Sequence, residues 1–369
     1  MADTGKDAGR AFGRDHHRMS LPGGSEPRLY VGTYARNGGA GLHSLHHSAA
    51  GVWSVGDAYP GAPNASFGAY SVRHDLHYFV DEQADGAVGA FRETEAGWRR
   101  LARLSTRGAE PCYVALDAAE SCLAVANYAS GSIAVFRVDD RTGLPVEPPA
   151  LLQNRGAGPV EDRQDGPHAH CACFGPDRRW LFQVDLGTDE ILTYAIDAAT
   201  GSLGERRVAF RAPAGSGPRH LVFHPVLPLA LLVSELASTL TVLEVGDGIL
   251  SARQMVSTLP PGFSGESLGG HLSLNSAADR VYVTNRGHDS IAIFAWDASG
   301  SLEPLQHAPS GGRSPRSFVL LEAERLLLLV NEEDGKISVF NVRYDGTLSP
   351  TDATLAIPGA AFLFVGPPG

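Results

Sequence analysis

The stretch Ser121–Phe136 reads SCLAVANYASGSIAVF, and its pattern returns twice in clear form later in the chain. These two copies are Asp279–Phe294 (DRVYVTNRGHDSIAIF) and Glu324–Phe340 (ERLLLLVNEEDGKISVF). In each copy an apolar run ends in polar residues, a turn containing Gly or Ser follows, and a second apolar run ends in Phe. Short apolar runs separated by turn signals predict antiparallel strands rather than helices.

Weaker copies extend the pattern over nearly the whole chain, each opened by a Gly or Pro anchor. The anchors recur every 44 to 56 residues, at Pro63, Pro111, Pro167, Pro218, Gly270, Pro315 and Gly359. Repeats of this length indicate a propeller, a solenoid or another array. Several strand-sized runs fit within each interval, and four strands per repeat are typical of a propeller blade. We therefore predict an all-β propeller with four-stranded antiparallel blades.

The two ends of the repeat region predict how the ring closes. Leu29–Tyr34 resembles the second strand of a repeat with no first strand before it, and Ala360–Val365 resembles a first strand with nothing after it. Pairing them would complete the first blade and remove both open edges. We predict seven blades closed by the C-terminal strand, with a polar, disordered tail over residues 1–27 and one propeller domain over residues 28–369.

Composition limits the partners and the compartment. The formal net charge of −11 argues against a nucleic-acid partner. No run is apolar and long enough to span a membrane, and the N-terminal region lacks the apolar core of a signal peptide. We expect a cytoplasmic protein, as a monomer or a dimer, whose four cysteines are buried free thiols.

Polar residues of the repeats should gather on one rim of the central channel, because the start of a first strand lies beside the end of the second. The fourth to sixth repeats are dense in titratable groups there: His168, His170, Arg219, His220, Glu235, His271 and Arg286. Asn127, Asn285 and Arg316 occupy comparable positions, although hydrogen bonding within the strand end is an equally good interpretation of Asn127. Two long connections, Asn154–Gly166 and Leu259–Gly269, should lie on the same face.

The chemistry open to this set is limited. A carboxylate or an imidazole can activate water as a general base, and arginines can bind an anion and stabilise an oxyanion. We find no Gly-x-Ser-x-Gly elbow and no Gly-rich nucleotide loop. A metal site built from His168, His170 and His271 is an alternative, although the neighbouring arginines would oppose a cation. We expect no cofactor.

Further motifs carry a resemblance to a known family. Gly217–Pro225 reads GPRHLVFHP and is followed by Ser234-Glu235-Leu236. This combination resembles the seven-bladed propeller lactonases of the bacterial 6-phosphogluconolactonase type, which are related to the fungal carboxy-cis,cis-muconate cyclases. The similarity spans about residues 29–365 and includes Gly166–His170, Pro176–Arg178, Asp185–Asp189, Thr284–Ser290 and Ser314–Phe318.

The resemblance implies a catalytic cluster of one histidine, two arginines and one glutamate. It carries over to His170, Arg219, Glu235 and Arg286, with His168 as a second candidate for the histidine. We expect the remaining polar positions to contact the substrate: His168, His220, His271, Asn127, Asn285 and Arg316.

The same resemblance implies the hydrolysis of an anionic sugar δ-lactone without a cofactor. The simplest substrate is 6-phospho-D-glucono-1,5-lactone, which would give 6-phosphogluconate in the pentose phosphate pathway. Glu235 or His170 would activate water, while Arg219 and Arg286 would hold the substrate. The alternatives are a related enzyme that hydrolyses or forms another lactone, as the muconate cyclases do, and a non-catalytic propeller that serves as a binding platform.

Overall fold

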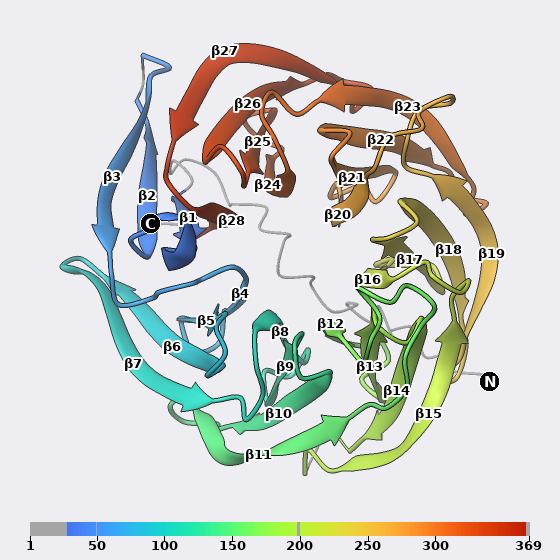
Figure 1. The fold of residues 1–369 in the computed structure, drawn as a ribbon. Helices are drawn as coiled ribbons and strands as arrows, with labels where there is room; N and C mark the ends of the chain where they lie inside the picture. Colours follow the sequence, from blue (N-terminus) through green and yellow to red (C-terminus); the bar gives the residue numbers. More distant parts are fainter. Residues whose placement is uncertain (1–27, 49, 198–199, 367–369) are drawn as a thin grey trace, which may run out of the picture.

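The computed structural model describes residues 28–48, 50–197 and 200–366. Seven four-stranded antiparallel sheets stand in a ring around a central channel (Figure 1), so the predicted all-β, seven-bladed propeller is confirmed. Within these ranges the single helical element is the 3-10 helix η1 (Ala35–Asn37). The tail predicted over residues 1–27 lies outside the described residues.

Each blade, numbered from the N-terminus, contributes strands in the same order from the channel outward. The innermost strands of blades 1 to 7 are β28 (Ala360–Val365), β4 (Gly68–Ser71), β8 (Pro111–Leu116), β12 (Ala169–Phe174), β16 (Pro218–Phe223), β20 (Leu268–Leu274) and β24 (Pro315–Leu321). The second strands are β1 (Leu29–Thr33), β5 (Leu76–Asp81), β9 (Cys122–Asn127), β13 (Trp180–Asp185), β17 (Leu229–Ser234), β21 (Arg280–Arg286) and β25 (Leu326–Asn331).

The third and fourth strands form the outer half of each blade. The third strands are β2 (Leu42–His47), β6 (Ala87–Thr94), β10 (Ser132–Val138), β14 (Glu190–Ile196), β18 (Thr239–Val245), β22 (Ser290–Trp296) and β26 (Lys336–Val342). The outermost strands are β3 (Trp53–Tyr59), β7 (Gly97–Ser105), β11 (Pro145–Gln153), β15 (Leu203–Arg211), β19 (Leu250–Ser257), β23 (Leu302–Pro309) and β27 (Leu348–Ala356).

The core of the molecule lies between neighbouring blades. Every residue of β9 and of β17 is buried, which explains their nearly continuous apolar sequence, since both faces of these strands are covered. Val233 of β17 and Leu272 of β20, for example, belong to one apolar cluster that joins blades 5 and 6. The outermost strands, such as β7, carry many exposed residues. Apolar side chains are thus packed between the blades, and polar side chains gather at the channel mouth.

The ring closes through the two ends of the chain. Strand β28 pairs antiparallel with β1, with Leu29 opposite Val365 and Val31 opposite Leu363. The predicted completion of the first blade by the C-terminal strand is confirmed. The closure unites the first and last segments of the described chain in one sheet, so the ring of blades is continuous.

A β-bulge follows the first paired residue of the innermost strand in several blades. In β16 the ladder pairs Pro218 with Ser234 and then His220 with Val233, so Arg219 is the extra residue. The residues at the corresponding places in β8, β12 and β24 are Cys112, His170 and Arg316. A bulge bends its strand and changes the direction of the extra side chain, and here these side chains lie where two strand ends meet.

Aspartates in the turns of one blade accept hydrogen bonds from the backbone beside the Pro anchor of the next blade. Asp189 accepts hydrogen bonds from the backbone nitrogens of Gly215 (2.7 Å) and Gly217 (2.8 Å). Asp289 accepts one from the nitrogen of Ser314 at 2.8 Å in the corresponding place before blade 7. Gly217 has a φ of +61°, and a Cβ there would approach Leu236 Cγ to 2.5 Å, so a side chain would clash. These contacts fix the positions of the residues that follow each anchor.

Two further expectations concern the cysteines and the membrane. Cys112, Cys122, Cys171 and Cys173 are all buried and free, as predicted. None of the described helices has the length and apolar character needed to cross a membrane.

Candidate active site

Glu235 is the centre of a buried ionic cluster at one mouth of the channel. It follows the last residue of β17, and its backbone nitrogen donates to Gly217 O (2.6 Å) while its carbonyl accepts from Gly269 N (2.8 Å). Its side chain is only 3% exposed. Arg219 Nη1 donates to Glu235 Oε2, and Arg286 Nη2 lies 2.7 Å from the same oxygen. Strands of blades 5 and 6 thus bring both predicted arginines to one carboxylate.

His170 joins this cluster from blade 4. Its Nε2 is 3.8 Å from Glu235 Oε2 and accepts a hydrogen bond from Arg219 Nη1, because a guanidinium can only donate. Its Nδ1 lies 3.7 Å from the Sγ of Cys112. The structure therefore brings together the four residues predicted to be catalytic, although they come from three different blades.

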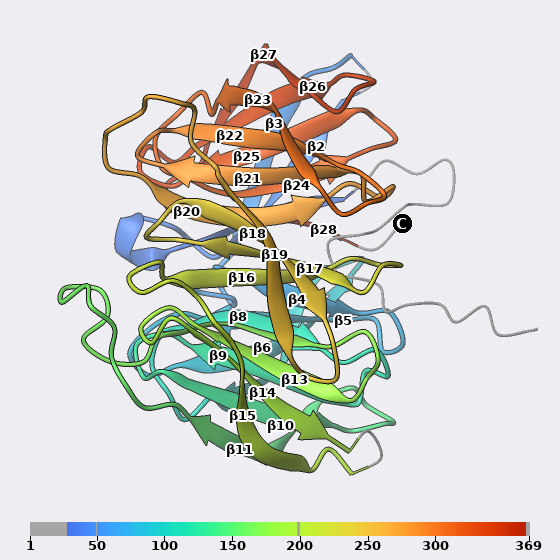
Figure 2. The same cartoon turned by 90° about the vertical axis from the view of Figure 1, so that its right-hand side faces the viewer.

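Arg163 completes the cluster, and sequence reasoning did not identify it. Its Nη2 lies 2.6 Å from Glu235 Oε1 and 3.4 Å from the hydroxyl of Tyr128. It belongs to the connection Asn154–Gly166, which the sequence did mark as long, and the loop between β11 and β12 projects from one face of the propeller (Figure 2). The features of the sequence that could have identified Arg163 were the length of this loop and the arginines in it.

Charge in the cluster is unbalanced toward positive. One carboxylate faces three guanidinium groups, so two positive charges lack a negative partner within the cluster. Burial disfavours the ionised form of Glu235, but the charges of Arg286 and Arg219 outweigh it and hold its pKa well below the usual range. Glu235 is therefore ionised at neutral pH.

The other titratable groups respond to the same field. Burial, with the positive charge of Arg219, lowers the pKa of His170 well below its usual range, so its imidazole is neutral at pH 7. Burial also lowers the pKa of Arg286 to about 10, against the attraction of Glu235. Within the described residues the buried Nε of Arg286 has no hydrogen-bond acceptor. A buried donor of this kind is available to a ligand.

His168 lies at the edge of the cluster rather than in its centre. Its ring stacks on Tyr128, with ring centroids 4.7 Å apart. Its Nδ1 is 3.2 Å from Tyr128 O, and its Nε2 is 3.1 Å from the carboxylate of Asp165. Since Asp165 and Arg163 belong to the same loop, His168 helps to hold that loop over the site.

His220 and His271 belong to a series of neighbouring rings that runs from His170 in blade 4 to Phe318 in blade 7. The ring of His220 is 5.4 Å from that of His170 and 5.7 Å from that of His271. His271 in turn lies 4.9 Å from the ring of Phe318 in blade 7. Both histidines are buried. They pack beside the cluster, in contact with other rings.

Asn127 and Asn285 lie inside their blades. The Nδ2 of Asn127 donates to Ser132 Oγ at 3.1 Å, and the Nδ2 of Asn285 donates to Ser290 Oγ at 3.2 Å and to Thr258 O at 2.8 Å. Both side chains are fully buried. The two amides thus stabilise the turns at the ends of their strands. For Asn127 this is the hydrogen bonding within the strand end that the sequence offered as the alternative to substrate contact.

Arg316 belongs to a second polar cluster, contributed by blades 1, 2 and 7. Its Nη2 donates to the Tyr34 hydroxyl at 2.5 Å and lies 3.7 Å from Glu82 Oε2, while its Nη1 lies 3.3 Å from Glu332 Oε2. The structure therefore separates Arg316 from the direct partners of Glu235. We call Tyr34, Glu82, Arg316 and Glu332 the Arg316 cluster.

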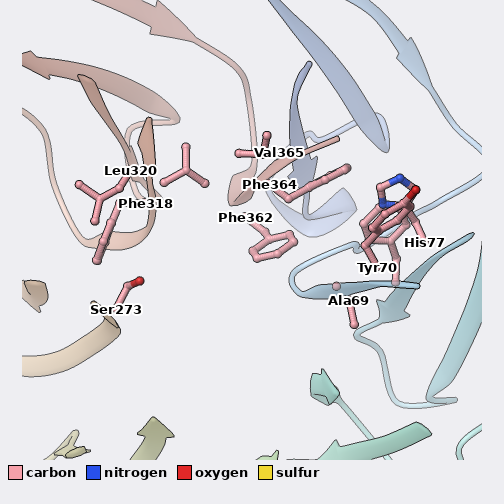
Figure 3. Close-up of a pocket in the computed structure, with 12 residues that line it drawn as sticks. Ala69, Tyr70, His77, Ser273, Phe318, Leu320, Phe362, Phe364 and Val365 are labelled. Atoms are coloured by element: carbon pink, nitrogen blue, oxygen red, sulfur yellow. The ribbon is translucent and has the colours of Figure 1, made fainter. Parts of the chain in front are cut away.

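A separate pocket lies along the channel at the later residues of the innermost strands. Ser273, Phe318, Leu320, Phe362 and Phe364 are among the residues that line it (Figure 3). No Asp, Glu, Lys or Arg lines it in the described part of the chain. Without an arginine or a lysine it suits an anionic substrate poorly, so the two charged clusters at the other end of these strands define the candidate site.

The alternative of a metal site receives no geometric support from the described ranges. Within them, no group of three or more His, Cys, Asp and Glu side chains is arranged to hold a metal ion. The side chain of His168 contacts Asp165, whereas that of His170 contacts Arg219.

Comparisons with known proteins show which family the chain belongs to. Residues 28–365 match the family model described as a lactonase with a 7-bladed β-propeller. The chain is 33% identical over 338 residues to the 6-phosphogluconolactonase of Bacillus subtilis (strain 168), an alignment that covers 89% of this chain and 95% of that protein.

Solved structures show the same similarity. The periplasmic gluconolactonase of Pseudomonas aeruginosa superposes with a TM-score of 0.85 at 26% identity, covering 93% of this chain and 99% of its own. A putative 6-phosphogluconolactonase of Bacteroides fragilis gives a TM-score of 0.83 at 27% identity, covering 92% and 98%. The chain therefore belongs to the seven-bladed β-propeller lactonase family.

Proposed function

We propose that the protein hydrolyses a sugar δ-lactone, with 6-phospho-D-glucono-1,5-lactone as the leading substrate, at the cluster around Glu235. The observation that carries this proposal is the convergence of three guanidinium groups and one neutral imidazole on a single buried carboxylate. The names of the relatives from Bacillus subtilis and Pseudomonas aeruginosa support the substrate class. The reaction would be a cytoplasmic step of the pentose phosphate pathway.

The arginines bind the substrate and stabilise the charge that develops on it. Two positive charges of the cluster lack a negative partner, and preorganised donors stabilise an oxyanion because they need no rearrangement during the reaction. Arg286 suits this role best, since burial disfavours its charge and its Nε lacks an acceptor among the described residues. An incoming anion would relieve both costs. Glu235 holds the three arginines in place.

His170 acts as the general base. Glu235 is a weak base because its arginine partners keep its pKa well below the usual range. The imidazole of His170 is neutral at pH 7, and its Nε2 carries a lone pair that Arg219 occupies in the structure without substrate. Once Arg219 turns to the anionic substrate, this lone pair can accept a proton from water.

The bond changes balance without a further reactant. The oxygen of a water molecule attacks the lactone carbonyl carbon as His170 takes its proton, and the carbonyl oxygen becomes an oxyanion beside the arginines. The bond between this carbon and the ring oxygen then breaks, and His170 returns the proton to the ring oxygen. The product is the open-chain hydroxy acid, which ionises to a carboxylate.

The test is hydrolysis of freshly made 6-phosphogluconolactone, measured against the spontaneous rate, by the wild type and by Arg219→Ala and Glu235→Gln. Loss of one donor to a developing oxyanion typically costs about 10²–10³-fold in rate, so we expect the rate of Arg219→Ala to fall by at least 100-fold. We expect a fall of the same size in Glu235→Gln, because this change releases the arginines that Glu235 holds. Arg141→Ala is the matched control, because Arg141 is exposed in the turn after β10. Equal rates for the wild type and both site variants would overturn the assignment.

A panel of lactones separates this proposal from its rivals. If the enzyme hydrolyses only a lactone of another kind, that lactone and not the sugar lactone is its substrate. No turnover of any lactone in either direction would leave a binding platform as the function.

A further inference from the structure

The Arg316 cluster repeats the construction of the Glu235 cluster on other blades. Arg219 and Arg316 each occupy the bulge after a proline anchor, opposite the end of the second strand. Glu235 and Glu332 each follow the last residue of that strand, with backbone nitrogens bonded to Gly217 O and Ser314 O. The two clusters therefore stand at equivalent heights on the same channel mouth.

The two clusters lie on different sides of that mouth. The Glu235 cluster is carried by β12, β16 and β20 with their neighbours, and the Arg316 cluster by β1, β4 and β24 with theirs, which Figure 1 shows on the two sides of the channel. They remain within electrostatic reach: burial is the main cause of the lowered pKa of Arg286, Glu235 opposes it, and the charges of Arg219 and, more weakly, Arg316 lower the pKa further. A single ligand that contacts both clusters would lie across the channel mouth.

The charge ratio of the Arg316 cluster is the reverse of that around Glu235. Here one guanidinium faces two carboxylates, Glu82 and Glu332, and the half-exposed Arg36 lies 3.9 Å from Glu332 Oε1. A phosphate or a carboxylate would meet like charges at this place. Neutral hydroxyl groups fit it, because they can donate to carboxylates and accept from a guanidinium.

The cluster also has acceptor capacity left. Tyr34 donates to Glu82 Oε2 at 2.6 Å, and Ser66 donates to the same oxygen. Among the described residues no hydrogen bond reaches Glu82 Oε1, and this oxygen is not among the buried unpaired atoms. The Glu82 side chain is 9% exposed, so Oε1 is the acceptor that Glu82 can offer to a ligand, while the contacts of its other oxygen hold the carboxylate in place.

We propose that the Arg316 cluster is a polyol subsite, which binds the ring hydroxyls of the lactone while the Glu235 cluster binds its anionic half. This inference rests on the proposed lactonase function. In a glucono-δ-lactone the carbonyl carbon and the carbon that bears the outer substituent flank the ring oxygen, and the hydroxyls occupy the opposite edge. A ring whose carbonyl faces the arginines around Glu235 therefore presents its hydroxyls to the Arg316 cluster.

The test compares D-glucono-1,5-lactone with δ-valerolactone, which has the same ring without hydroxyls. The wild type should prefer the hydroxylated lactone in kcat/KM. Glu332→Gln weakens an acceptor of the hydroxyls, and Tyr34→Phe removes the buried phenol that positions Glu82 and Arg316. In both variants kcat/KM for gluconolactone should fall by at least 10-fold, mainly through KM, while that for δ-valerolactone changes by less than about threefold, since a site built to bind a hydroxyl loses most when the pair is broken. Glu333→Gln and Tyr344→Phe are the matched exposed controls.

The outcomes distinguish the two proposals. A wild type that shows no preference for gluconolactone, or variants that lose both lactones equally or neither, would overturn the polyol subsite and leave the lactonase function intact. A wild type that hydrolyses neither lactone and no phosphorylated one would overturn the lactonase function and this inference with it. If the buried Tyr34→Phe variant does not fold, Glu332→Gln decides, because the Glu332 side chain is 16% exposed.

Discussion

The two ionic clusters at the channel mouth use the same backbone positions for opposite electrostatic purposes. Around Glu235 one carboxylate gathers three arginines, and around Arg316 one arginine gathers two glutamates and a tyrosine. The first cluster carries an excess of positive charge that suits an anion, and the second is balanced once Arg36 is counted, with two arginines and two glutamates. Equivalent register in a repeat fold therefore determines where a side chain lies but not what it binds.

The difference arises from what each blade adds to the shared positions. The bulge provides Arg219 in blade 5 and Arg316 in blade 7, so these two blades contribute the same pair of Arg and Glu. In the Glu235 cluster the neighbouring blade and the loop before blade 4 supply two more cations, Arg286 and Arg163. The partners of Arg316 from neighbouring blades are instead Tyr34 and Glu82.

The largest expected contrast is in stability. Glu235→Gln leaves three guanidinium groups around a neutral amide in a nearly fully buried place, and breaking a buried ion pair typically costs about 3–5 kcal/mol. Glu332→Gln affects a carboxylate that is 16% exposed and whose contacts to Arg316 and Arg36 are long, 3.3 Å and 3.9 Å, so the loss should be smaller. Thermal unfolding should show a large fall in Tm for the first variant and a small one for the second. Equal shifts would show that the two clusters are energetically alike.

A smaller effect is expected from the loop that only the Glu235 cluster possesses. Arg163→Ala removes the 2.6 Å contact to Glu235 Oε1. Hydrogen bonds to charged groups typically contribute about 1.5–3 kcal/mol, so kcat/KM for the lactone should fall by about 10- to 100-fold, with Arg163→Lys in between. Arg155→Ala, an exposed arginine of the same loop, serves as the control. Full activity in Arg163→Ala would remove this arginine from the site.

The smallest expected effect is on the pH dependence of activity, through which the charge of one cluster influences the other. His170 must be unprotonated to act as a base, and burial with the charge of Arg219 lowers its pKa well below 6.5. Activity should therefore stay constant through neutral pH and decline only as the pH falls through that lowered pKa. The charge of Arg316 is one of the smaller contributions to this shift.

Removal of that charge in Arg316→Gln should move the acid limb of the kcat profile upward by a fraction of a pH unit. An acid limb at the ordinary histidine value in the wild type would exclude His170 as the base. An unchanged limb in Arg316→Gln would show that the clusters act independently.

The repeat was sufficient to predict the architecture and most of the site. Short apolar runs and the anchors are local patterns, so strands, blade number and closure could be derived from them. Glu235 and three of its partners, His170, Arg219 and Arg286, followed from register and family resemblance. Arg163 did not, because its loop has no periodicity and its position depends on how the loop folds back over blade 4.

Register alone did not predict which residue of the polar pair at the end of each second strand faces the channel. Asn127 and Asn285 are the last residues of β9 and β21 in the ladder with their third strands, and they turn into the blade. The next residue along, such as Glu235 after Ser234, faces the channel. Side chains alternate along a strand, so a shift of one residue exchanges channel for blade interior. The sequence marked the pair but not which member faced the channel.

By itself, the sequence of this protein determined the seven-bladed ring, its closure by the C-terminal strand and the rim on which chemistry gathers, because these depend on patterns repeated along the chain. The tertiary structure decided which side chains meet. Bulges direct Arg219 and Arg316 toward different partners, a loop adds Arg163, and burial sets the charge states of Glu235 and His170. These outcomes depend on contacts between blades, which no single repeat contains.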